Sequence, residues 1–106
     1  MNQRVWIYCR VLFQSHKELL DFQSVRLTEF ARKRQMKIIG CTKEIDTGQN
    51  FQRYSITQLL PYIKTKRIDM ILIENKVNLF SDDNLFYEFS LLCDYYHVKI
   101  IETKSS

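Results

Sequence analysis

Four short apolar runs alternate along this chain with segments whose apolar residues recur at helical spacing, and this alternation constrains the fold most. The clearest run, IDMILIE at residues 68–74, has the unbroken apolar character of a strand buried on both faces. Similar runs are RVWIYCRV at 4–11, KIIGCTKEI at 37–45 and VKIIET at 98–103. Because helices usually supply the crossovers between parallel strands, the sequence predicts an α/β fold with a mainly parallel sheet.

The three segments between these runs have the apolar periodicity of amphipathic helices. The first helix is expected over about residues 16–34, and the second over about residues 53–64, where Pro61 should kink or restart it. The third follows the capping sequence Ser81-Asp82-Asp83. The predicted buried stripes are Leu20, Leu27, Phe30 and Ala31, then Ile56, Leu59, Leu60 and Ile63, then Leu85, Phe89, Leu92 and Tyr96.

Right-handed crossovers restrict how these elements can be arranged. We expect a three-layer α/β/α domain whose four strands lie in the order 2-1-3-4, with the first helix on one face of the sheet and the others on the opposite face. The 106 residues suffice for one modest core, so a single domain over residues 1–106 is predicted.

Composition excludes several classes of function. The net charge of +4, from 16 basic and 12 acidic residues, permits contact with nucleic acid but does not argue for it. No apolar run approaches the roughly 20 residues of a membrane span, and the N-terminus lacks the apolar core of a secretory signal. We therefore expect a cytoplasmic protein that has no membrane partner.

Metal and cofactor sites are not expected either. Cys9, Cys41 and Cys93 are far apart in apolar contexts, which is typical of free core thiols in a reducing compartment. The two histidines have no ligand cluster near them in the sequence, and the two glycines form no phosphate-binding loop.

Three of the predicted strands have their C-terminal ends at residues 10–13, 46–53 and 74–81. In parallel sheets, ligand sites form where the strands end, so these segments should converge on one rim. Arg10 lies in the apolar stretch IYCRVLF, where a cation is costly unless it is paired or faces a cleft. We therefore place Arg10 at the end of its strand, facing that rim.

Four motifs follow one another along the chain: YCRV at 8–11, LLDFQ at 19–23, DTGQ at 46–49 and RYSITQLLPYIKTKRIDMILIE at 53–74. The most specific pieces are Tyr8-x-Arg10-Val11 and the segment from Arg53 to Asp69. In this order, over about residues 4–103, they resemble the catalytic domain of the serine recombinases, the resolvase and invertase family.

The resemblance implies that this chain lacks the nucleophile and the phosphate-stabilising residues of the family. In the family, a serine follows the YxRV strand and attacks a DNA phosphodiester, but Leu12 occupies that position here. The family also places an Asp-Arg pair and a further Arg around the scissile phosphate. The aligned residues here are Val77, Asn78 and Ser81, so the resemblance implies a domain without an intact catalytic site.

Four polar residues keep the type and spacing of the family, and we treat them as candidates for a residual anion site. Arg10 and Asp46 either form an ion pair at the rim or bind phosphate. Gln23 is either a buried amide that ties a loop backbone or a ligand contact, and Arg53 either anchors the start of its helix or binds an anion. The basic run at 32–34 is either a solvated helix end or a surface that faces DNA.

Family members continue into a long dimer helix and a helix-turn-helix domain, and this sequence ends after its fourth predicted strand, so no C-terminal DNA-binding domain is expected. The favoured hypothesis is a non-catalytic domain that binds a protein, such as an active recombinase or its DNA complex. The alternative is a fragment of an enzyme of DNA strand exchange. A third hypothesis is a flavodoxin-like domain that binds a small anion. DNA binding by this chain alone should be weak, and the sequence leaves the oligomeric state open.

Overall fold

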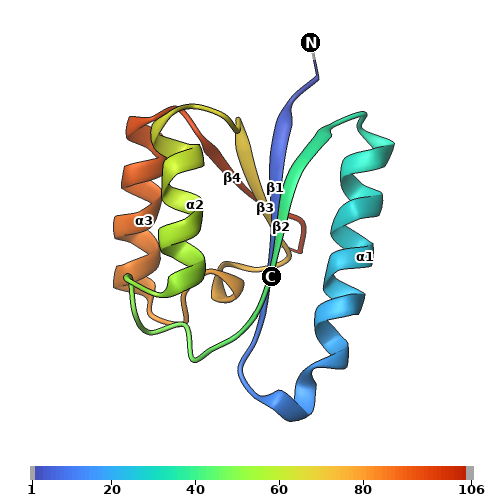
Figure 1. Cartoon of the computed structure of the whole chain (residues 1–106), viewed down its shortest axis with the longest axis vertical. Helices are drawn as coiled ribbons and strands as arrows, with labels where there is room; N and C mark the ends of the chain where they lie inside the picture. The colour runs from blue at the N-terminus through green and yellow to red at the C-terminus, as the bar shows by residue number, and fades with distance from the viewer. Residues whose placement is uncertain (1, 105–106) are drawn as a thin grey trace.

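The computed structural model describes residues 2–104 and contains a four-stranded sheet in the order β2-β1-β3-β4, with every neighbouring pair parallel (Figure 1). The strands are β1 (Arg4–Val11), β2 (Lys37–Ile45), β3 (Met70–Ile73) and β4 (Lys99–Glu102). The predicted strand order and parallel pairing are confirmed. Since β1 and β3 lie in the middle of the sheet, their residues are mostly buried, whereas β2 is an edge strand.

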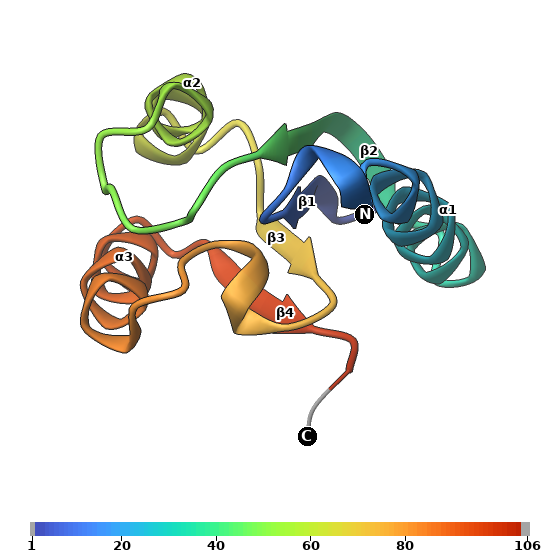
Figure 2. The same cartoon turned by 90° about the horizontal axis from the view of Figure 1, so that it is seen from below.

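The helices cover the two faces of the sheet as expected. In Figures 1 and 2, α1 (Glu18–Lys33) lies on one side, and α2 (Tyr54–Lys64) and α3 (Asp83–Tyr95) lie on the other. Two short 3-10 turns, η1 (Gln14–His16) and η2 (Lys76–Asn78), follow β1 and β3. Within residues 2–104, no helix combines the length and the apolar character that a membrane crossing needs.

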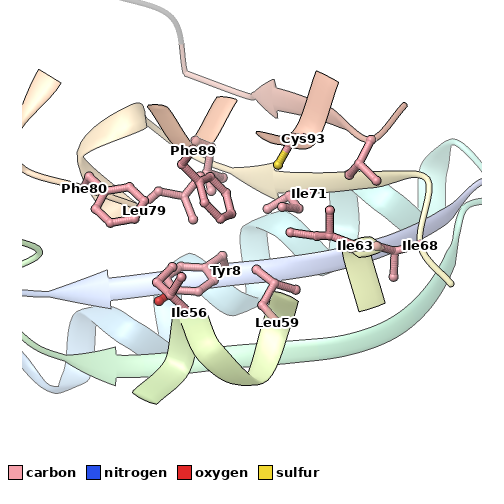
Figure 3. Packing of buried hydrophobic residues seen from close by; sticks show 12 residues of the cluster. Tyr8, Ile56, Leu59, Ile63, Ile68, Ile71, Leu79, Phe80, Phe89 and Cys93 are labelled. Carbon is pink, nitrogen blue, oxygen red and sulfur yellow. The ribbon is translucent and has the colours of Figure 1, made fainter. Parts of the chain in front are cut away.

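The core consists of two apolar layers separated by the sheet. Between the sheet and the α2–α3 pair, Tyr8 and Ile71 pack with Phe80 and Phe89, as Figure 3 shows. On the α1 side, Cys9 and Leu72 pack with Leu27. Successive β1 residues thus enter opposite layers, because strand side chains alternate between the two faces.

Two expectations from the sequence need correction. Pro61 does not restart the second helix, because α2 runs as one element from Tyr54 to Lys64. Cys41 is not a core thiol: it is exposed because it lies on the edge strand β2, where α1 leaves part of the strand uncovered. Cys9 and Cys93 are buried and free, as predicted.

Candidate functional site

The carboxyl ends of β1, β2 and β3 meet at one rim, and the segments that follow them are joined there by hydrogen bonds. The Asp46 N–H, directly after β2, donates to the Val11 carbonyl at the end of β1 (3.1 Å). The Ser81 N–H, in the segment after η2, donates to the Gly48 carbonyl (2.9 Å). The convergence predicted for residues 10–13, 46–53 and 74–81 therefore occurs.

Arg10 lies at this rim with its guanidinium directed at backbone carbonyls rather than at solvent. Its Nη1 donates to the Asp46 carbonyl oxygen (2.6 Å), and its Nη2 donates to the Val77 carbonyl oxygen. Only 7% of Arg10 is exposed, and its Nε has no hydrogen-bond partner within the described residues. Burial, and secondarily the nearby Arg53 guanidinium, lower the pKa of Arg10.

Gly48 packs against the guanidinium of Arg10 and helps to enclose it. A Cβ atom at position 48 would lie 2.6 Å from the Arg10 Cζ atom, closer than real contacts allow. Gly48 also has φ +74°, a left-handed conformation that glycine adopts without the usual Cβ penalty. No pocket opens within residues 2–104.

Arg53, the N-cap residue of α2, is the centre of a second, denser network. Its Nη2 donates to Glu44 Oε1 (2.7 Å), and its Nε donates to the same oxygen (3.1 Å). Nη2 also donates to the Leu79 carbonyl oxygen (2.5 Å), and the guanidinium lies over the Phe80 ring at 4.7 Å from its centroid. The side chain is 2% exposed, so Arg53 anchors the loops around it and has little surface left for a ligand.

Tyr8 completes the Arg53 network. Its hydroxyl donates to Glu44 Oε1 (2.5 Å) and accepts from Arg53 Nη2 (3.1 Å). Burial, and then the Glu44 carboxylate, raise the pKa of Tyr8, so its phenol stays protonated. Burial alone would lower the pKa of Arg53, but the hydrogen bonds and the negative charge of Glu44, together with the hydrogen bond to Tyr8, outweigh it and raise that pKa.

Gln23 and Asn78 hold the main chain of β1 in place at Arg10. The Gln23 amide accepts from the Arg10 N–H (3.1 Å) and donates to the Arg10 carbonyl (3.2 Å). Asn78 Nδ2 donates to the same carbonyl (3.3 Å), and Asn78 Oδ1 accepts from the Asn75 N–H (2.9 Å). In this structure Gln23 acts as a buried amide that ties backbone, one of the two roles considered for it.

Arg10 and Asp46 do not form the side-chain ion pair considered from the sequence. The Asp46 carboxylate instead accepts from the Gly48 N–H (2.8 Å) and lies 3.6 Å from Arg53 Nε. In the turn after β2, the Asp46 side chain folds back onto its own loop, so the carbonyl of Asp46, and not its carboxylate, contacts Arg10.

The other three positions singled out from the sequence also lie at this rim. Leu12 and Val77 are 44% and 46% exposed, although the Val77 carbonyl is held by Arg10. Ser81 Oγ donates to the Thr47 carbonyl (2.8 Å). The two hydrogen bonds of Ser81, to Thr47 and Gly48, fasten the loop that covers Arg10.

One solved structure decides the family. The chain matches the C-terminal catalytic domain of ISC1926 TnpA, an IS607-like serine recombinase, with 30% identity and a TM-score of 0.88. The match covers 97% of this chain and 71% of that chain. The chain belongs to the serine recombinase family.

Two further structures share the fold of this serine recombinase family member. The N-terminal catalytic domain of TP901-1 integrase is 21% identical, with a TM-score of 0.80 over 95% of this chain and 77% of that chain. A resolvase family site-specific recombinase from Streptococcus pneumoniae is 18% identical, with a TM-score of 0.83 over 96% of this chain and 72% of that chain. No sequence model of a protein family and no curated protein matches the chain.

Glu44 is a residue of the site that was not predicted from the sequence of this serine recombinase family member. In the register of β1 and β2, Glu44 is paired with Arg10. With side chains alternating along each strand, Glu44 falls on the same face of the sheet as Arg10 and Tyr8. It was overlooked because the register between two strands is not written in either strand alone.

Proposed function

We propose that this member of the serine recombinase family does not catalyse strand transfer and acts by binding another protein, with an active recombinase or its DNA complex as the class of partner. The observation that carries the proposal is the occupied guanidinium of Arg10. Its two terminal nitrogens donate to the Asp46 and Val77 carbonyls beneath Gly48, and only 7% of Arg10 is exposed, so its remaining N–H groups have little access to a phosphate.

The groups beside Arg10 support the same proposal. Leu12 supplies no nucleophile, and Val77, Asn78 and Ser81 supply no charge at the positions that the resemblance assigns to phosphate stabilisation. The apolar side chains of Leu12 and Val77 are nearly half exposed on this rim. Such a surface suits contact with a protein better than contact with a phosphate.

The alternative is that the domain is part of an enzyme of DNA strand exchange whose remaining groups lie outside this chain. The observation in its favour is that Arg10 and Arg53 lie close enough for their charges to interact. Paired guanidinium groups at one rim are suited to a phosphodiester if the 46–48 loop moves.

A rescue experiment distinguishes the two. Leu12→Ser restores a hydroxyl, yet a serine hydroxyl is a weak nucleophile without charge stabilisation, and each missing cationic contact costs on the order of 10² in rate. We expect Leu12→Ser and the matched control Leu12→Ala to give the same result with supercoiled plasmid, with neither nicking nor a protein–DNA adduct on a denaturing gel.

Further substitutions extend the test. Adding Val77→Asp, Asn78→Arg and Ser81→Arg to Leu12→Ser should be necessary for any adduct, since these changes restore the charges that the rim lacks. An adduct from Leu12→Ser alone, absent from Leu12→Ala, would overturn the proposal in favour of the enzyme.

A further inference from the structure

The outer surface of α3 carries aromatic and acidic side chains. Tyr87, Leu91 and Tyr95 recur every fourth residue, so they form one stripe, and they are 63%, 49% and 76% exposed. Asp83 and Glu88 are exposed on the same side of the helix. We call these five residues the α3 face.

The α3 face is not neutralised by cations of the same helix. The sequence from 82 to 96 contains no lysine, arginine or histidine, although the whole chain carries a net charge of +4. Within residues 2–104, Asp83 pairs only with Lys76 (3.2 Å) across an exposed contact, and Glu88 has no ion pair. Exposed aromatic rings flanked by carboxylates attract apolar groups that are accompanied by cations.

A surface of the complementary kind lies on α1. Leu19, Phe22 and Val25 recur every third residue and are 47%, 56% and 62% exposed. Arg32 and Lys33 follow at the C-terminal end of the helix and are also exposed. We call these five residues the α1 face. Arg32 pairs with Glu29 on its own helix, whereas Lys33 has no carboxylate partner within the described chain.

The two faces match in length and in the order of their groups when the helices run antiparallel. The apolar stripes span about 9 Å on α1 and about 12 Å on α3, at 1.5 Å per helical residue. On α1 the cations follow the stripe, and on α3 Asp83 precedes it, so an antiparallel pair brings Arg32 and Lys33 toward Asp83 and Glu88. The helix dipoles are then also opposed, which is favourable.

We propose that the α3 face of one copy binds the α1 face of a second copy, through apolar contact between the stripes and ion pairs at one end, where Arg32 and Lys33 meet the acidic residues of the α3 face. The helices α1 and α3 lie on opposite sides of the sheet, as Figures 1 and 2 show, so the α1 face and the α3 face of one copy are separate patches. The contact is therefore head to tail, and each copy retains one unused face.

The affinity should be low and salt-dependent. A single helix-on-helix contact lies at the small end of protein interfaces, and association must first offset the loss of translational and rotational freedom. Salt screens exposed ion pairs, so added salt should weaken the contact without abolishing its apolar part. The contact does not depend on whether the domain cleaves DNA.

Sedimentation velocity tests the proposal over protein concentrations from about 10 μM to about 1 mM, the range of a weak interface. We expect the weight-average sedimentation coefficient of the wild type to rise with concentration. Tyr95→Ala should raise the dissociation constant by about tenfold, as for truncation of an aromatic side chain in an interface. Tyr54→Ala is the matched control, because Tyr54 is 75% exposed on α2 and outside both faces, and it should behave as wild type. A wild type that stays monomeric throughout, or equal losses from Tyr95→Ala and Tyr54→Ala, would overturn the proposal.

A charge-swap mixture tests the geometry. The variant Asp83→Lys with Glu88→Lys repels the α1 face, and the variant Arg32→Glu with Lys33→Glu repels the α3 face. Each should stay monomeric alone, with a circular dichroism spectrum like that of the wild type.

Mixed in equal amounts, the two variants should associate, because the unaltered α1 face of the first variant meets the unaltered α3 face of the second, and the swapped α3 and α1 faces are again opposite in charge. Association of either folded variant alone at wild-type strength, or no pair in the mixture at concentrations where the wild type associates, would contradict the proposal.

Discussion

Two arginines are buried at one rim, and different groups stabilise their guanidinium charges. Arg53 is surrounded by a carboxylate, a phenol and a carbonyl, whereas Arg10 relies on carbonyls and a nearby loop. The difference appears in their pKa values: the pKa is lowered for Arg10 and raised for Arg53. Arg53 is therefore the more securely held charge, and Arg10 carries the cost of its burial with less compensation.

Removing the Arg53 guanidinium should strongly destabilise the domain. Arg53→Met leaves Glu44 buried without a cation, and breaking a buried ion pair in this way costs about 3–5 kcal/mol. Urea denaturation followed by circular dichroism measures the loss.

The double variant Arg53→Met with Glu44→Gln identifies the origin of that loss. Because it removes both charges, it should be more stable than Arg53→Met. A double variant as unstable as Arg53→Met would show that the loss comes from packing and not from the unpaired charge of Glu44. The stability of Arg53→Lys should lie between those of the wild type and Arg53→Met. Lysine keeps the charge but loses the planar fork that reaches Glu44 and Leu79 together.

At this scale, the sequence indicated the place of Arg10 but not its partners. An arginine in an apolar strand had to reach a rim, and Arg10 does. The acceptors of its hydrogen bonds are the main-chain oxygens of Asp46 and Val77, and every residue has such an oxygen, so no side-chain pattern could indicate them.

At the scale of elements, strands were predicted better than the segments between them. The predicted bounds of β1 and β2 are those observed, whereas β3 is shorter than the apolar run 68–74, since Glu74 and Ile68 lie outside its pairing. The short turn η2 was not expected. It is fixed by Asn75 and Asn78, whose side chains and N–H groups cap each other across three residues, a local exchange that apolar periodicity does not reveal.

A single carboxylate joins the start of β1 to the start of β3, and it should make stability depend on acid. Asp69 accepts from the Arg4 N–H (2.8 Å), from Arg4 Nε (3.0 Å) and from Arg4 Nη2 (3.0 Å). Hydrogen bonds from the Arg4 side chain are the main reason that the pKa of Asp69 lies well below its ordinary value.

The sign of the effect follows from linkage. A carboxyl whose folded-state pKa is depressed contributes stability above its unfolded pKa, and this contribution is lost as the pH falls through about 4 toward the folded value. Asp69→Asn should therefore be less stable than wild type near neutral pH and should lose less stability on acidification. Thermal melts at a series of pH values measure this, and parallel pH profiles for the two proteins would contradict it.

For the molecule as a whole, we expect weak and salt-sensitive binding to duplex DNA. The net charge is only +4. In addition, four carboxylates lie at the start of and along α3, and this helix contributes no cation. Contacts with phosphates release counterions, so the little affinity that exists should fall steeply with salt. Fluorescence anisotropy with a labelled duplex at low and physiological salt tests this. Submicromolar, sequence-selective binding at physiological salt would contradict it and would favour the enzyme.

The loop that covers Arg10 also makes the order of amino-acid changes matter over evolutionary time. Under the proposed function, a route from this rim to phosphoryl transfer starts by freeing the Arg10 nitrogens from the Asp46 and Val77 carbonyls, with the loop lifted and the hydrogen bonds of Ser81 broken. On that proposal, those steps lower stability before a nucleophile at position 12 could bring any benefit. The fold itself would then oppose a change toward catalysis, and the packing around Arg10 would be enough to keep an arginine at that position.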